Sequence, residues 1–278
     1  MRAATWRALV VDDNAINLEV AVSRLQQLGL QADSADGGEQ AVALALSVAY
    51  DLIVMDVQMP VVDGITATRR IRQALGLRPP IVALTANADD NDRKACLAAG
   101  MNDYLTKPLQ EAHLQRVLQR WLPGWSPSGA GSAPSPASAH SPTGRPGATE
   151  PDADSEGLRE RLAAVAGLDL AGSLGNLGGR LPSLERVLRR FATSYRAGEP
   201  ALALAASQGD AAALWQTCHA LRGACAVMCA TALVQRIEAL EAVLHAQQPS
   251  AAWQDPVQQL HTELVDLARQ LAEALALV

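Results

Sequence analysis

The chain has 278 residues, enough for about two domains of ordinary size. Hydrophobic residues make up 49% and charged residues 19%, so the chain can form buried cores and is not disordered throughout. The formal net charge of -6 argues against a nucleic-acid-binding protein that relies on a basic surface. The sequence contains no uninterrupted apolar run of about 18 residues, so we expect no membrane insertion by this chain and a cytoplasmic location.

One segment divides the chain by composition. Residues 123–156 are rich in Pro, Ser, Gly and Ala and have few large apolar side chains. Such a segment cannot bury enough surface to offset its ordering entropy, so we predict a flexible linker there. The linker separates a first domain over 1–122 from a second domain over 157–278. The first domain carries 12 basic and 14 acidic residues and the second 10 and 11, so neither is basic.

The first domain alternates short β-rich runs with segments of helical periodicity. Strands are predicted at 7–11, 30–35, 51–55, 80–84 and 102–105. Helices are predicted at 15–28, 38–48, 64–75, 88–99 and 109–121. Five βα units of this kind predict a doubly wound α/β fold, with a parallel sheet covered by helices on both faces. In such folds a functional site forms at the carboxyl ends of the strands.

The second domain shows helical patterns and no convincing strand. Helices are predicted at 158–166, 181–197, 200–208, 210–227, 229–246 and 253–276. Asp210 has the side chain of an N-cap, and Pro200 and Pro256 lie where a first helical turn tolerates proline. Four long amphipathic segments with short connections predict an antiparallel four-helix bundle.

Polar residues follow the predicted strands of the first domain. Asp12 and Asp13 follow the first strand, Asp56 the third, Thr85 the fourth, and Lys107 the fifth. Three clustered carboxylates repel one another unless a cation lies among them, and oxygen ligands favour a hard ion such as Mg²⁺. With a lysine and a hydroxyl nearby, this set suits phosphoryl transfer in which one carboxylate attacks.

These residues lie in four motifs: VVDDN (10–14), DLIVMDVQMPVVDG (51–64), ALTAN (83–87) and DYLTKP (103–108). In order and spacing, the motifs closely resemble a bacterial response-regulator receiver domain, which has a flavodoxin-like (βα)5 fold. The resemblance implies that Asp56 is the phosphoryl acceptor. It also implies a Mg²⁺ site formed by Asp12, Asp13, Asp56 and the main-chain carbonyl of Gln58, with Asp13 preferred over Asp12 as a direct ligand.

The same resemblance gives roles to residues around the acceptor. Lys107 would contact the phosphoryl group, and its bond to Pro108 is expected to be cis. Thr85 would move toward the phosphoryl oxygens, and Tyr104 would follow it inward as the second switch residue. Taken singly, each residue has a structural explanation, as a cap, a turn, a core aromatic or a surface charge. Their joint occurrence at the strand ends favours the functional interpretation.

The second domain contains one histidine in a distinctive setting, His219. The helix that carries it has a core stripe formed by Leu214, Cys218, Leu221 and Cys225. His219 lies off this stripe, so we expect it to face solvent. Gly223 removes side-chain bulk one turn away, where another protein could approach, and Arg222 could offset the charge of a phosphorylated ring. The alternative is a surface histidine with a chance glycine.

The segment CHALRGACAVMCA (218–230) resembles the signature of histidine-containing phosphotransfer (HPt) domains. The preceding GLDLAGSLGNLGG (167–179) fits the leading helix of that family, and its glycines lack the strand and Gly-Lys-Ser/Thr of a phosphate loop. The resemblance implies that His219 carries a phosphoryl group, with Trp215, Arg222 and Gly223 on the docking surface. Cysteines in this region are expected to fill a helix interface rather than to sense redox state.

Together the two resemblances imply a two-component phosphorelay protein, as in the C-terminal part of bacterial hybrid sensor histidine kinases. Asp56 would accept a phosphoryl group from a sensor histidine kinase, or from the kinase core of the same longer protein, and exchange it with His219. His219 would pass it to a downstream response regulator. We see no ATP-binding kinase domain in this sequence, and a longer sensor kinase could tether the chain to the inner membrane. The alternatives are a DNA-binding or an allosteric output regulator, gated by the first domain, in which His219 is inert.

Overall fold

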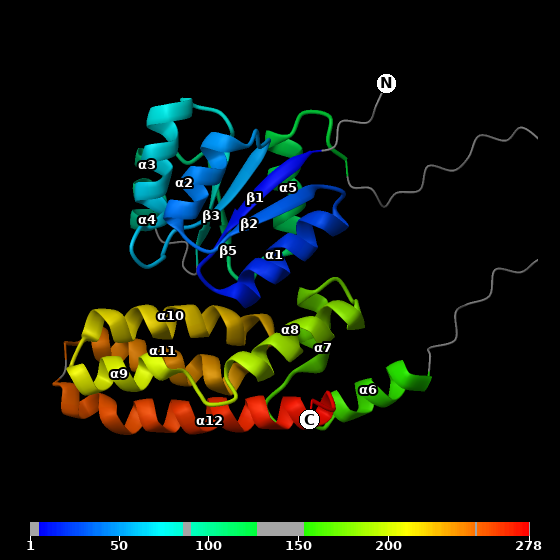
Figure 1. The fold of residues 1–278 in the computed structure, drawn as a ribbon, viewed down its shortest axis with the longest axis vertical. Helices are drawn as coiled ribbons and strands as arrows, with labels where there is room; N and C mark the ends of the chain where they lie inside the picture. The colour runs from blue at the N-terminus through cyan, green and yellow to red at the C-terminus, as the bar shows by residue number, and fades with distance from the viewer. Residues whose placement is uncertain (1–5, 86–89, 127–152, 248, 278) are drawn as a thin grey trace, which may run out of the picture.

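The computed structural model describes residues 6–85, 90–126, 153–247 and 249–277, and it contains two domains (Figure 1). The first domain has a five-stranded parallel sheet in the order β2-β1-β3-β4-β5. Its strands are β1 (Arg7–Val11), β2 (Gln31–Ala35), β3 (Leu52–Asp56), β4 (Ile81–Thr85) and β5 (Asp103–Thr106). Its helices are α1 (Ala15–Gln27), α2 (Gly38–Ser47), α3 (Gly64–Leu75), α4 (Asp90–Ala99) and α5 (Glu111–Trp121). The predicted doubly wound α/β fold is confirmed.

Alternation along the strands places helices on both faces of this sheet. On β1, Ala8 and Val10 pack with α1 and α5, whereas Leu9 and Val11 pack with α2, α3 and α4 (Figure 1). The strands β3 and β4 are buried along their whole length, as expected for the centre of a parallel sheet. Both end one residue later than predicted, so Asp56 and Thr85 are the last residues of their strands.

The second domain is a helical bundle, and no strand occurs among its described residues. Its helices are α6 (Ala153–Ala163), α7 (Leu170–Asn176), α8 (Leu181–Ser194), α9 (Pro200–Gln208), α10 (Ala211–Val227), α11 (Thr231–His245) and α12 (Gln254–Ala274), with the 3₁₀ turn η1 (Ser250–Trp253). The consecutive helices α8 and α9 form one side of the bundle, and α10, α11 and α12 form the other three. Phe191 is fully buried among leucines at its centre. Asp210 caps α10 as predicted, accepting from the amides of Ala212 and Ala213.

The predicted linker, 123–156, differs from the structure at both ends. Trp125 is buried against the first domain, and its indole Nε1 donates to the carbonyl of Leu28 at 3.1 Å. Helix α6 begins at Ala153, five residues before the predicted start of a helix, because the acidic residues Asp154 and Glu156 favour a first helical turn. The central part of the linker, residues 127–152, lies outside the described residues.

The two domains are in contact through α1, which packs against α8 and α10 (Figure 1). Ile16 and Val20 of α1 belong to the same apolar cluster as the core of the bundle. None of the helices in the described parts of the chain is both long and apolar enough to cross a bilayer.

Candidate functional site

Three carboxylates meet at the carboxyl edge of the sheet. Asp12 follows β1 directly and Asp56 ends β3, and these side chains are 0% and 1% exposed. Asp13 is partly buried beside them, and oxygen atoms of the three residues lie within 4.8 Å of one another. Burial raises the pKa of Asp56. Burial, together with the charge of Asp12, raises the pKa of Asp13 to about 6. Three carboxylates this close together repel one another unless a cation lies among them.

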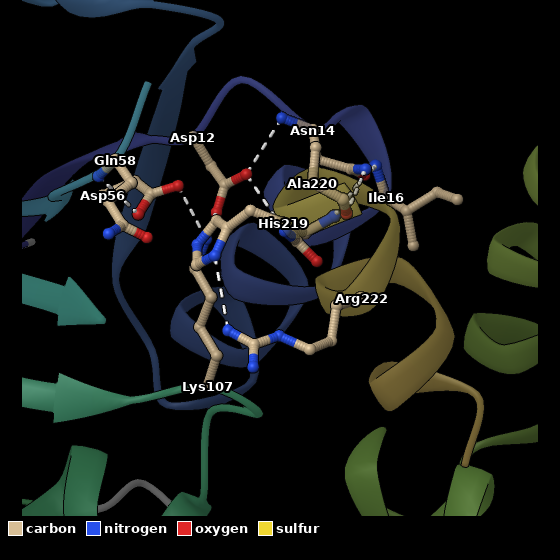
Figure 2. A network of polar contacts seen from close by, with 10 residues as sticks. Asp12, Asn14, Ile16, Asp56, Gln58, Lys107, His219, Ala220 and Arg222 are labelled. Carbon is tan, nitrogen blue, oxygen red and sulfur yellow. Dashed lines mark hydrogen bonds and ion pairs between the residues drawn. The ribbon is translucent and has the colours of Figure 1, made fainter. Parts of the chain in front are cut away.

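Lys107 supplies one cation to this cluster. Its Nζ lies 2.7 Å from Asp12 Oδ2 and 2.6 Å from Asp56 Oδ2 (Figure 2). Burial alone would lower the pKa of Lys107, but Asp12 and Asp56 outweigh this effect and hold it above its ordinary value. The bond to Pro108 is cis, as expected, and the amide of Lys107 donates to the carbonyl of Thr85 at 2.8 Å.

The cluster of carboxylates also fits a divalent ion. Lys107 carries one positive charge against three acidic side chains, and all the available donors are oxygens, the ligands that Mg²⁺ prefers. The Gln58 amide donates to Asp56 Oδ1 at 3.3 Å, which holds this loop against the acidic edge. Asp12, Asp13, Asp56 and the carbonyl of Gln58 are therefore suitable residues to hold the ion.

The start of α1 fixes the orientation of Asp12. Asn14 caps α1, and its Oδ1 accepts from the amides of Ile16 and Asn17. Asp12 Oδ1 accepts from the main-chain amide of Asn14 at 2.9 Å (Figure 2). It also accepts from Asn17 Nδ2 at 3.1 Å. These bonds leave Oδ2 to face Lys107. Sequence reasoning did not identify Asn17, whose only signal is its position three residues after the cap.

His219 is 7% exposed, so the expectation that it faces solvent is wrong for this structure. Its side chain does leave the core stripe of α10, as the periodicity predicts, but the first domain covers it. Trp215 stacks on the imidazole with ring centroids 5.2 Å apart. The Arg222 Nη2 lies 3.3 Å from His219 Nδ1 (Figure 2).

The surroundings of His219 hold its ring in the neutral form. Burial lowers the pKa of His219 to about 3, and the positive charges of Lys107 and Arg222 act in the same direction. A neutral imidazole keeps one nitrogen lone pair available for attack on an electrophile. Glu241 of α11 forms an ion pair of 3.2 Å with Arg222 and so restrains the guanidinium beside the ring. Sequence reasoning also missed Glu241, which resembles any acidic residue on an amphipathic helix.

The interface brings His219 and the carboxylates to the same place. Asn14 Nδ2 donates to the carbonyl of Ala220, one residue after His219, at 3.1 Å. A cavity of about 340 Å³ is lined from one side by residues that include Asp13 and from the other by His219 and Trp215. Gly223 faces Asn17, and a Cβ built on this glycine would lie 2.7 Å from Asn17 Nδ2. The glycine therefore permits the close approach of α1 to α10.

The two expected switch residues lie apart from each other. Thr85 ends β4 next to the acidic edge and is mostly buried. Tyr104 is 37% exposed, and the guanidinium of Arg93 lies over its ring, 5.2 Å from the centroid. Tyr104 points outward in this structure, and its inward movement upon phosphorylation of Asp56 stays a prediction. Its neighbour Leu105 takes the buried position on β5, so alternation along this edge strand directs Tyr104 outward.

Two family models match separate parts of the chain. Residues 8–119 match the family model of the response regulator receiver domain, and residues 180–272 match that of the Hpt domain. The sensor protein GacS of Pseudomonas syringae pv. syringae is 44% identical over 119 residues, which cover 41% of this chain and 13% of that protein. The signal transduction histidine-protein kinase BarA of Escherichia coli (strain K12) is 40% identical over 117 residues, covering 42% and 13%.

Among solved structures, the receiver domain of the sensor histidine kinase PA1611 from Pseudomonas aeruginosa PAO1 is 50% identical, with a TM-score of 0.40. The match covers 42% of this chain and 98% of that one, which has a magnesium ion coordinated in its active-site cleft. The chain spans only 13% of the length of GacS and of BarA. None of these findings supports a DNA-binding or allosteric output domain in the second half.

Proposed function

Because the chain carries a receiver domain followed by an Hpt domain, we propose that it relays a phosphoryl group between Asp56 and His219. The docked arrangement of the two domains carries this proposal. Asp56 lies at the acidic edge of the sheet, and His219 is directed toward that edge across the interface (Figure 2). In this proposal, Asp56 first receives the phosphoryl group from a histidine kinase and then transfers it to His219.

The surroundings of both residues suit the transfer step. The bond between phosphorus and the Asp56 oxygen breaks, its electron pair returns to the carboxylate, and a nitrogen lone pair of His219 forms the new bond. The ring proton stays on the other nitrogen. Lys107, now shared by Asp12 and Asp56, would contact the phosphoryl oxygens, and Arg222 would balance the charge that arrives on His219.

The metal site and the switch residues complete the proposal. Asp12, Asp13, Asp56 and the Gln58 carbonyl would hold Mg²⁺, which when bound neutralises charge on the phosphoryl oxygens. Thr85 lies close enough to the acidic edge to respond to a phosphorylated Asp56. Trp215 orients the His219 ring by stacking on it.

The partners proposed for the chain follow from its two domains. An upstream sensor histidine kinase, or the kinase core of the same longer protein, would phosphorylate the receiver domain. A downstream response regulator would collect the phosphoryl group from His219. The relatives GacS, a sensor protein, and BarA, a signal transduction histidine-protein kinase, are consistent with such partners. The chain matches only a small part of each. We place the relay in the cytoplasm.

Phosphorylation mapping in the full chain tests this function. With Mg²⁺ and a small phosphodonor, the wild-type chain should acquire label on Asp56 and then on His219. Asp56→Asn should remove both labels, because an amide cannot attack phosphorus. His219→Gln should keep the label on Asp56. Label on His219 in the Asp56→Asn chain would contradict the proposed order of transfer.

A further inference from the structure

A second contact between the domains lies at the opposite end of α1 from His219. Arg24, in the last turn of α1, donates from Nη2 to the main-chain carbonyl of Gly175 in α7 at 2.7 Å. Its Nη1 donates to Glu111 of α5 at 2.9 Å, within the receiver domain. Arg24 is 3% exposed. A single buried guanidinium therefore links two receiver helices to the Hpt domain.

The end of α7 is suited to receive a cation. Carbonyls in the last turn of a helix lack partners within the helix and carry partial negative charge. Gly178 follows α7 in the left-handed region, at φ +70°, and a Cβ there would lie 2.7 Å from Gln27 Oε1 and 3.2 Å from Arg24 Nη1. The next residue, Gly179, has a similar φ of +75°, but its Cβ would have no neighbour within 4 Å. Of these two glycines, only Gly178 lies against α1, where an added side chain would have to displace the ends of the Gln27 and Arg24 side chains.

The remaining ion pairs of the interface are weaker candidates for recognition. Glu19 of α1 lies 3.5 Å from Arg186 and 3.8 Å from Arg190 of α8, and both arginines are largely exposed. Exposed pairs of this kind contribute little to binding. Arg24 is buried and charged, so removing it would take away the bond to the Gly175 carbonyl and would leave Glu111 without its ion-pair partner.

We propose that the Gly175 carbonyl and Gly178 form an arginine socket, which selects receiver domains with an arginine at the end of their first helix. Arg24 is the residue that this chain's own receiver domain places in the socket. The proposal rests on the transfer between Asp56 and His219, because any receiver domain that reaches His219 has to lie across the same helices. The chain's own receiver domain covers His219 and therefore competes with an incoming one.

Transfer between two full-length chains tests the socket. The donor chain is phosphorylated on Asp56 and carries His219→Gln together with Gly223→Leu, which keeps its receiver domain off its own bundle. The acceptor chain carries Asp56→Asn. Arg24→Ala in the donor should raise the KM for the acceptor about tenfold or more, because the docking bond is lost, and leave the maximal rate unchanged. Arg24→Ala in the acceptor should instead lower KM, because its own receiver domain then covers His219 less firmly.

Several controls separate docking from folding. Labelling of Asp56 in the donor by a small phosphodonor should not change with Arg24→Ala, whereas a misfolded receiver domain would lose it. Arg24→Lys keeps the charge but cannot reach both Glu111 and the socket, so it should fall between wild type and alanine. Two further acceptors carry Arg24→Ala together with either Gly178→Asn or Gly179→Asn. The acceptor with Gly178→Asn should have the higher KM. Asparagine tolerates the left-handed region, so the two variants share their backbone cost.

The outcomes distinguish the socket from the proposed function. If Arg24→Ala in the donor leaves KM unchanged, or if Gly178→Asn and Gly179→Asn behave alike, the socket is refuted. If the single wild-type chain never labels His219, the transfer itself is refuted, and the socket with it. If the wild-type chain labels His219 but the donor without Arg24→Ala never labels the acceptor, the socket alone is refuted.

Discussion

Gly223 is the residue at which a small change should have the largest effect on transfer. It lies in α10, four residues after His219, and its missing side chain leaves room for Asn17. A Cβ at this position would lie 2.7 Å from Asn17 Nδ2 and 3.3 Å from its Oδ1. Asn17 is buried and donates to Asp12, so it cannot move aside without disturbing the acidic edge.

The geometry gives the size of the effect. Ordinary contact begins at 3.4 Å, so a single methyl group has to separate the domains locally by about 0.7 Å. A misplacement of about 1 Å in a group-transfer geometry costs about a hundredfold in rate. Gly223→Ala should therefore slow transfer about tenfold or more. Gly223→Leu, with three further carbons, should slow it by more than about a hundredfold.

The assay is single-turnover transfer from phosphorylated Asp56 to His219 in the full chain, with thermal melts in parallel. Leucine is a better helix former than glycine by about 1 kcal/mol, so the bundle itself should not lose stability. The matched control is Gly157→Leu in α6, where a Cβ would meet only Arg161 Nη1, at 3.5 Å. Equal transfer rates in the Gly223→Leu and Gly157→Leu chains would refute the idea that this face of α10 is the docking surface.

Three further predictions concern the metal site, pH and the bundle core. Asp13→Ala should weaken Mg²⁺ binding in a titration, and an unchanged affinity would mean that the ion lies elsewhere. The docked fraction, followed by hydrogen exchange of α1, should contain a component that falls as pH drops from about 7 to 5 and that His219→Gln removes. The contributions of Asp13 and Asp56, whose pKa values are raised by burial, remain in both chains. The docked fraction falls with falling pH because docking favours the neutral ring. The pKa of His219 is about 3 in the docked structure, where the ring is buried near Lys107 and Arg222, and its ordinary value is about 6.5, so protonation favours separation of the domains. Phe191→Ala should lower the free energy of unfolding of the bundle by about 3–5 kcal/mol in denaturant melts, because Phe191 is fully buried there. The receiver domain should still be labelled on Asp56 by a small phosphodonor, and loss of that label would show that its fold depends on the bundle core.

The sequence predicts the receiver fold well because each apolar run ends abruptly in polar residues. Runs of this kind become buried parallel strands, and their ends share one edge of the sheet, so the proximity of Asp12, Asp56 and Lys107 could be expected. Helix periodicity likewise showed that His219 leaves the core of its own bundle. It could not show what covers the ring, because periodicity describes one helix and not the surface of another domain.

Sequence reasoning also missed contacts between residues that lie far apart in the chain. Arg24 and Gly175 are 151 positions apart, and Asn14 and Ala220 are 206 apart. Each resembles an ordinary polar or small residue within its own helix. The short helix α7 was expected only from the family resemblance, because seven residues with two glycines give too little periodicity to predict a helix. Only the docked structure shows which side chains meet.

Helix α1 contributes to two hydrophobic cores at once. Ala21 and Leu25 pack beneath the sheet of the receiver domain, whereas Ile16 and Val20 pack with the interior of the bundle. A substitution on either side of this helix is therefore constrained by a different domain. Recombination that joins a foreign receiver domain to this bundle would preserve only one of the two faces. The two domains should consequently be inherited and exchanged as a pair, although each has a fold of its own.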